Sequence, residues 1–168
     1  MLQLEHRHLT NIVRANQALT CLTWAPYTPE EHKCFTSPIT AILNHTFDAD
    51  LPVSMETIQE FCQEKIAGFG LDPTKSIMLL TAVPQIYMQQ ACCKDEVTDL
   101  EVRVFCTAGL GNALSPGDPT IYNEEVAQVS SHVGTINIIV VINRKLTQKA
   151  MLELSQVVTM AKCQALYY

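Results

Sequence analysis

Residues 135–142 read Thr135-Ile136-Asn137-Ile138-Ile139-Val140-Val141-Ile142, and this run decides the fold class. A short, near-continuous stretch of β-branched residues is typical of a strand buried on both faces, so it predicts the central strand of a sheet. Shortly after it, Thr147 can cap a helix that extends to about Leu166 and carries an apolar stripe at helical spacing. A buried strand followed by an amphipathic helix indicates a layered domain with helices packed on a sheet.

The rest of the chain supplies further strands and helices. Short apolar runs predict strands at 18–24, 39–43, 76–83 and 101–107. In the last of these, Glu101 and Arg103 share a side with Phe105 and Thr107, so this side should be the wetter one. One helix is predicted from Ser54 to Phe69, where Gly68 and Gly70 offer a left-handed stop. Pro84 predicts the start of a short helix that runs to Cys92.

These elements predict one domain over residues 1–168, with an α/β or α+β layered fold in which helices pack on a mixed β-sheet. Charged residues make up 17% of the chain, against about 25% in a typical soluble domain. This low charge favours a homo-oligomer, in which a second subunit covers part of the surface.

Charge and hydropathy exclude several classes of protein. The net charge is −6 and the 11 Lys and Arg are scattered, which argues against a nucleic-acid or anionic-membrane partner. No apolar stretch reaches the roughly 18–20 residues that span a bilayer. The first residues, 1–10, contain no apolar signal-peptide core, so we expect a cytoplasmic protein.

The seven cysteines predict neither disulfides nor a metal site. No C-x-x-C pair and no H-E-x-x-H pattern occurs, and Cys92 and Cys93 are adjacent. We therefore expect most of the thiols to be core residues in a reducing compartment. No metal and no cofactor is predicted.

Glycine concentrates in one block that follows the predicted strand at 101–107. Gly109, Gly111, Asn112 and Asp118 lie in it, yet it lacks the third glycine of a dinucleotide fingerprint and the Gly-Lys pair of a phosphate loop. Two interpretations stay open here. The block is either a long turn between strands or a loop that presents backbone N–H groups and polar side chains to a ligand.

Four further polar residues stand at unexpected places. Asn137 interrupts an apolar strand, where its amide either braces neighbouring backbone or faces a site. Asn44-His45 ends the strand at 39–43, and histidine is the usual proton shuttle near neutral pH, although a structural histidine is the commoner case. Lys162, near the end of the last helix, either interacts with the helix dipole or binds an anionic group.

Taken together and in order, these blocks resemble the adenosylcobinamide amidohydrolase family of cobinamide salvage. The resemblance covers about residues 20–166, and its blocks are Ile42-Leu43-Asn44-His45, Gly70-Leu71-Asp72-Pro73, Leu79-Leu80-Thr81-Ala82-Val83, Thr107-Ala108-Gly109-Leu110-Gly111-Asn112-Ala113, Gly117-Asp118, Gly134-Thr135-Ile136-Asn137-Ile138 and Ala161-Lys162. It implies hydrolysis of the amide between the corrin propionate and aminopropanol, which yields adenosylcobyric acid. A corrinoid is then the substrate or ligand.

The resemblance gives positions for candidate site residues, and the chemistry of amide hydrolysis suggests their roles. We expect His45, Asn44 and Asn112 to be catalytic, with His45 as general base or acid. The expected substrate-binding residues are Thr107, Gly109, Gly111, Asp118, Thr135, Asn137 and Lys162. Asn44, His45, Asn112 and Asn137 should converge on one cleft.

Two alternatives stay open beside this activity. The family usually has a glutamate where the last helix carries Met160, so a corrinoid-binding module without catalysis is one of them. The other is a related amidohydrolase that acts on a different small amide.

Overall fold

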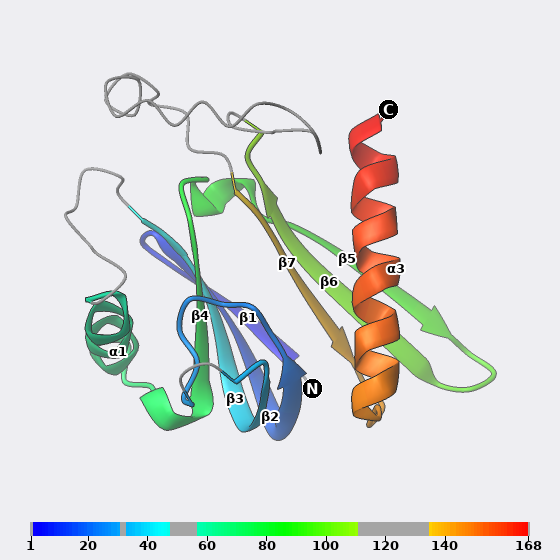
Figure 1. Cartoon of the computed structure of the whole chain (residues 1–168), viewed down its shortest axis with the longest axis horizontal. Coiled ribbons are helices and arrows are strands. Elements are labelled where there is room, and N and C mark those ends of the chain that lie inside the picture. The colour runs from blue at the N-terminus through cyan, green and yellow to red at the C-terminus, as the bar shows by residue number, and fades with distance from the viewer. Residues whose placement is uncertain (1, 31–32, 48–56, 111–134, 168) are drawn as a thin grey trace.

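The computed structural model describes residues 2–30, 33–47, 57–110 and 135–167 and shows an α+β fold (Figure 1). The described residues form a four-stranded sheet, a three-stranded sheet and two long helices. This confirms the layered fold expected from the sequence. Among these residues, no helix is both long enough and apolar enough to cross a bilayer.

The four-stranded sheet has the order β1-β2-β3-β4 and is mixed. Its strands are β1 (Leu2–Arg7), β2 (Thr10–Leu22), β3 (Phe35–Thr46) and β4 (Ser76–Thr81). The first three pair antiparallel, whereas β3 and β4 run parallel, so that Thr46 lies beside Thr81 where both strands end. The predicted strand at 18–24 is the second half of β2, whose first half forms a hairpin with β1.

The three-stranded sheet has the order β5-β6-β7 and is antiparallel. Its strands are β5 (Gln89–Asp95), β6 (Leu100–Ala108) and β7 (Ile136–Ile142). Two predictions are corrected here. The central strand is β6, because β7 pairs with β6 alone among the described strands. The helix expected from Pro84 to Cys92 is a single 3-10 turn, η2 (Gln85–Tyr87), followed at once by β5, because strand pairing with β6 takes over the backbone of residues 89–95.

Two apolar clusters form the core, one on each face of the four-stranded sheet. On the outer face, α1 (Ile58–Gly68) places Cys62 and Ile66 against Leu43 and Met78. On the inner face, the two sheets meet through Ile42, Ile77, Phe105, Ile139 and Val141, among others. The prediction for the faces of β6 is therefore wrong. Phe105 and Thr107 are its buried residues, because they face the other sheet.

The helix α1 ends, and the last helix begins, near the residues predicted from the sequence. Gly70 takes the left-handed conformation (φ 69°) just after α1, as its sequence position predicted, whereas Gly68 does not. The predicted cap Ser54 lies outside the described residues. The helix α3 (Gln148–Tyr167) starts with a bond from the Ala150 N–H to the Thr147 hydroxyl, which confirms that cap.

The predicted apolar stripe of α3 is only partly covered. Met151 is buried and Leu154 and Val158 are half-buried, whereas Val157 remains 59% exposed. The helix lies beside β7 in Figure 1. A groove lined by residues of α3, β2 and β7, among others, separates the helix from the sheets.

The cysteines differ from the expectation of core thiols. Cys62 is buried, and burial raises the pKa of its thiol to about 12. Cys21 and Cys106 are half-buried, while the other four are exposed. Two of these, Cys92 and Cys93, lie on the edge strand β5, whose residues are all exposed.

Candidate functional site

Polar side chains gather where the two sheets come together. The strands β3 and β4 end at the same edge, and β6 ends beside the start of β7 with Thr107 opposite Asn137. Figure 1 shows these four strand ends at one end of the molecule. Residues far apart in sequence therefore share one buried location.

Asn44, Thr107 and Asn137 are joined by hydrogen bonds there. The Nδ2 group of Asn137 donates to Asn44 Oδ1 at 2.7 Å and to the Leu80 carbonyl at 2.9 Å. Asn44 Nδ2 in turn donates to Thr107 Oγ1 at 3.0 Å. The structure thus brings together three of the predicted site residues from β3, β6 and β7. We call these three residues, together with the side chain of Gln85, which bonds to Asn44, the amide cluster.

Gln85 extends the cluster, and the sequence analysis missed it. Its Oε1 accepts from Asn44 Nδ2 at 3.3 Å, and its Nε2 donates to Thr46 Oγ1 at 3.1 Å. Its backbone carbonyl accepts from Asn11 Nδ2 at 3.0 Å. Asn11 was also missed, and it lies directly opposite Asn44 in the β2–β3 register. The sequence signal for both was a polar residue in an otherwise apolar strand or turn. Only the folded structure shows that these residues lie next to Asn44.

The cluster is buried, and most of its polar groups bond to one another or to nearby backbone. Asn44 and Thr107 are 1% and 0% exposed, and no fully buried side-chain N or O atom in the described ranges lacks a hydrogen-bond partner. Because the Leu80 carbonyl can only accept, Asn137 must turn its Nδ2 toward it. No described residue donates a hydrogen bond to Asn137 Oδ1. Within the described part of the cluster, this oxygen is therefore an acceptor without a donor.

His45 does not join the amide cluster. Neighbouring residues of a strand point to opposite faces, so His45 faces α1 while Asn44 faces the three-stranded sheet. Its Nδ1 lies 2.7 Å from Thr10 Oγ1, and its ring centroid lies 5.9 Å from that of Phe61. The expected convergence of the imidazole and the amides on one cleft is therefore not what the structure shows.

Burial sets the protonation of His45. The ring is 5% exposed, and burial lowers its pKa to about 4, helped by the positive charge of Lys65, while a backbone hydrogen bond with Leu9 acts in the opposite direction. The imidazole is thus neutral at pH 7. It can accept a proton, but it is a weak base.

The remaining predicted residues are placed as follows. Gly109 donates its backbone N–H to the Thr135 carbonyl at 3.0 Å, so these two residues close the ends of the segment between β6 and β7. That N–H is engaged and does not face a ligand. Gly111, Asn112 and Asp118 lie outside the described residues. Lys162 is half-buried on α3, and no described residue pairs with it.

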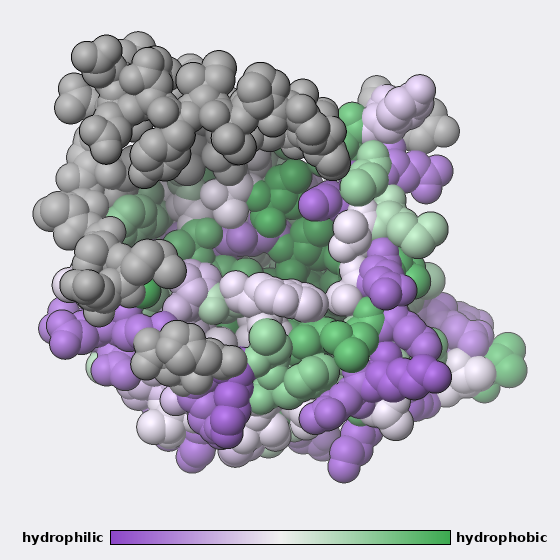
Figure 2. Space-filling view, in the orientation of Figure 1, coloured by the Kyte–Doolittle hydropathy of each residue, from purple (hydrophilic) through white to green (hydrophobic). Residues whose placement is uncertain are grey.

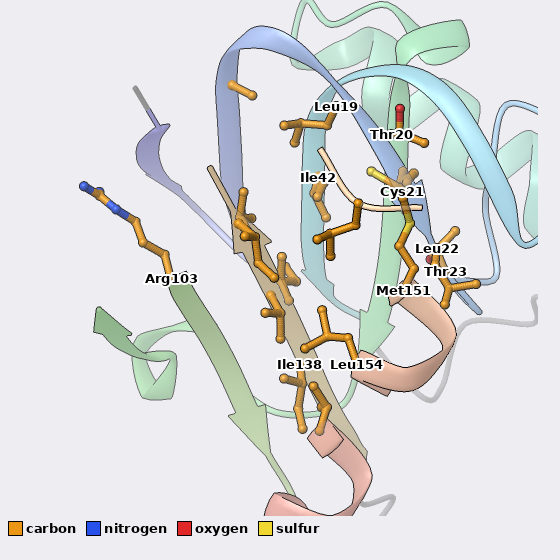
Figure 3. Close-up of a pocket in the computed structure, with 18 of the residues that line it drawn as sticks. Leu19, Thr20, Cys21, Leu22, Thr23, Ile42, Arg103, Ile138, Met151 and Leu154 are labelled. Atoms are coloured by element: carbon orange, nitrogen blue, oxygen red, sulfur yellow. The ribbon is translucent and has the colours of Figure 1, made fainter. Parts of the chain in front are cut away.

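A groove of about 1230 Å³ separates α3 from the sheets, and both Asn137 and Lys162 line it. Figure 2 shows it as a hollow with hydrophobic residues inside. In Figure 3, side chains of β2, β3, β7 and α3 point toward one another across it, while Arg103 of β6 extends away. The groove exceeds the usual 300–1,000 Å³ of small-ligand sites.

Nothing in the described ranges forms a group of three His, Cys, Asp or Glu side chains that could hold a metal ion. The described site residues offer amides, hydroxyls, one neutral imidazole and one amine.

Comparison with known proteins decides the family. The family model for adenosylcobinamide amidohydrolase matches residues 3–168. The chain belongs to this family. Neither the curated proteins nor the solved structures provide a match. Membership of the adenosylcobinamide amidohydrolase family supports a hydrolase that handles cobinamide, and a corrinoid substrate fits it.

Proposed function

We propose that this member of the adenosylcobinamide amidohydrolase family hydrolyses the amide that links aminopropanol to the corrin propionate. Water adds to the amide carbonyl, the C–N bond breaks, and the products are adenosylcobyric acid and free aminopropanol. The family match over residues 3–168 is the observation that carries this proposal. The wide groove and the amide cluster at its edge are consistent with a large amide substrate.

The proposal divides the candidate residues into two groups. Asn137 is the member of the amide cluster that lines the groove, and Asn44, itself bonded to Thr107, holds it in place. It orients amide groups of the substrate through its Oδ1. His45 stays the predicted proton-transfer group, held by Thr10 and neutral at pH 7, although its ring lies against α1 on the other face of β3 from Asn44. Asn112 and Asp118 stay predicted site residues. The homo-oligomer and the cytoplasmic location also stay predictions.

The test incubates the purified full chain with adenosylcobinamide and measures released aminopropanol by mass spectrometry. We expect stoichiometric release of aminopropanol and adenosylcobyric acid. The variant His45→Gln should lower kcat by roughly 100-fold, since general acid–base groups contribute about 10²–10⁴-fold. His8→Gln, an exposed histidine on the β1–β2 turn, is the matched control.

The second candidate is a corrinoid-binding module without turnover. The weak basicity of His45 and the mutual hydrogen bonding of Asn44 with Thr107 and Asn137 favour it. A visible-absorbance titration separates the two. Binding of adenosylcobinamide without aminopropanol release, even at high protein concentration, would establish the module and contradict the hydrolase.

A further inference from the structure

We propose that the groove between α3 and the two sheets seats the corrin macrocycle, with the amide side chains of the corrinoid directed to Asn137 at one edge. This inference rests on the proposed function for its ligand class and adds the place where that ligand binds. Three features of the groove support it: its shape, its aliphatic walls and its polar edge at Asn137.

The shape comes from the way in which the sheets diverge. Asn137 ties β7 to β4 through the Leu80 carbonyl near the strand ends. Away from that point, β4 and β7 separate in Figure 1, and α3 lies on the far side of β7. The resulting space of about 1230 Å³ is open to one side and wider than most small-molecule sites, as a bulky planar ligand requires.

The lining has the chemistry of a macrocycle seat. A corrinoid is a flat ring whose rim carries methyl groups and amide side chains. Aliphatic residues make the walls, with Leu22 from β2, Leu79 from β4, Ile138 from β7 and Leu154 from α3. Burying the methyl-bearing ring on such walls is favourable in proportion to the apolar surface removed from water.

Five charged side chains line the groove, Glu101, Arg103, Arg144, Lys145 and Lys162, and two of the four cations are engaged by neighbouring groups. Arg103 pairs with Glu101 at 2.5 Å, and Arg144 donates to the Thr98 carbonyl at 2.6 Å. Lys162 is half-buried and has no partner among the described residues. Its amine can donate to the carbonyl oxygen of a corrin amide or pair with the carboxylate of the product.

The polar edge supplies the complementary acceptor. Asn137 is 8% exposed and lines the groove, and its Nδ2 is used by Asn44 and Leu80. Its Oδ1, which receives no hydrogen from any described residue, is therefore oriented before a ligand arrives. A primary or secondary amide N–H of the corrinoid is the donor that this oxygen fits.

The test blocks the groove from two opposite walls. Thr159 of α3 and Thr20 of β2 both line the groove and are exposed, so Thr159→Trp and Thr20→Trp fill space without disturbing the core. Met160, the next residue on α3, is 71% exposed and does not line the groove, so Met160→Trp is the matched control.

The probe is adenosylcobyric acid, because it carries the macrocycle and cannot be hydrolysed at the aminopropanol amide. We expect both groove variants to weaken its binding at least tenfold in a visible-absorbance titration, and Met160→Trp to bind within twofold of the unmodified chain. Circular dichroism of each variant confirms that it is folded.

The outcomes separate this inference from the proposed function. If the unmodified chain releases aminopropanol and both folded groove variants bind the probe as tightly as it does, the groove is not the seat and the hydrolase stands. If the unmodified chain neither binds the probe nor hydrolyses adenosylcobinamide, both proposals fail.

Discussion

At the scale of single residues, the orientation of the amide cluster follows from one carbonyl. Leu80 belongs to β4, whose free edge faces β7, so its backbone oxygen needs a donor from outside the four-stranded sheet. Asn137 supplies that donor, which turns its Oδ1 away and fixes the direction of every later bond in the chain of amides. An amide in an apolar strand is tolerated because its polar atoms find partners across two sheets.

Thr107 offers a direct test of this network. Thr107→Val keeps the shape but removes the oxygen that accepts from Asn44 Nδ2, leaving that group only the longer bond to Gln85. We expect a loss of about 1–3 kcal/mol in the free energy of unfolding, measured by urea denaturation. Thr107→Ser retains the hydroxyl and should lose about 1 kcal/mol. A valine variant as stable as the unmodified chain would contradict the role of this bond.

His45 predicts a pH dependence of stability. Its pKa is lowered in the folded protein to about 4 from the ordinary 6.5, so the unfolded chain takes up the proton first as pH falls. This contribution to stability is complete above pH 6.5, is lost between pH 6.5 and 4, and does not change below that range. The loss is roughly 3 kcal/mol for a shift of this size.

The measurement compares unfolding free energies of the unmodified chain and His45→Gln from pH 7.5 to 4. Carboxylates that titrate at the lower end affect both proteins alike, so their difference isolates the imidazole. We expect the difference to shrink as pH falls. Parallel curves over this range would show that burial does not hold His45 neutral.

Sequence reasoning identified the residues of the cluster better than their arrangement. Asn44, Thr107 and Asn137 were each selected as site residues, and the structure brings them within hydrogen-bond distance of one another. Gln85 was not selected, because its position depends on a 3-10 turn that sequence reasoning interpreted as a helix. The separation of His45 from Asn44 does follow from strand alternation, once both residues are placed in one strand.

At the scale of elements, the end of α1 shows how one backbone conformation stops a helix. Gly70 has a φ of 69°, and its N–H donates to the Ala67 carbonyl at 2.9 Å. Added Cβ atoms at Gly68 and Gly70 would meet nothing within 4 Å, so neither position is limited by space. The two glycines differ in backbone conformation alone.

This difference predicts opposite effects of one substitution. Gly70→Ala should lower the free energy of unfolding by about 1 kcal/mol, because an L side chain is strained at positive φ. Gly68→Ala, at the end of the helix itself, should raise it by up to about 1 kcal/mol, because alanine favours helix. Thermal and urea unfolding of the two variants measure both effects. Equal destabilisation by both substitutions would contradict this account.

The element-level predictions succeeded where the signal was local. The strands at β3, β4, β6 and β7 and the two helices were all expected, with ends that differ by a few residues. The central position of β7 was wrong because hydrophobicity reports burial, which the facing sheet supplies to Ile139 and Val141 without a second strand partner. The β1–β2 hairpin was missed because His6, Arg7 and His8 give its turn no clear signal.

At the scale of the whole molecule, the inner apolar cluster joins the two sheets. Phe105 from β6 is 3% exposed and packs with Ile139 and Val141 against Val13, Ile42 and Ile77 of the other sheet. With the amide cluster at one edge, this contact couples elements that share few backbone hydrogen bonds. The two sheets should therefore unfold together and not one after the other.

The single tryptophan makes this coupling measurable. Trp24 follows β2 and so reports on the four-stranded sheet, whereas Phe105 belongs to the other sheet. Phe105→Ala should lower the free energy of unfolding by about 3–5 kcal/mol, because it opens a cavity in the core. Val104→Ala, one residue away on the half-buried outer face, should cost about 1 kcal/mol and is the control.

Since the sheets share this cluster, the Trp24 fluorescence midpoint should shift together with the circular dichroism midpoint. A fluorescence transition left unchanged by Phe105→Ala would mean that the sheets are independent units, and the groove between them would then lack the fixed walls that a ligand seat requires.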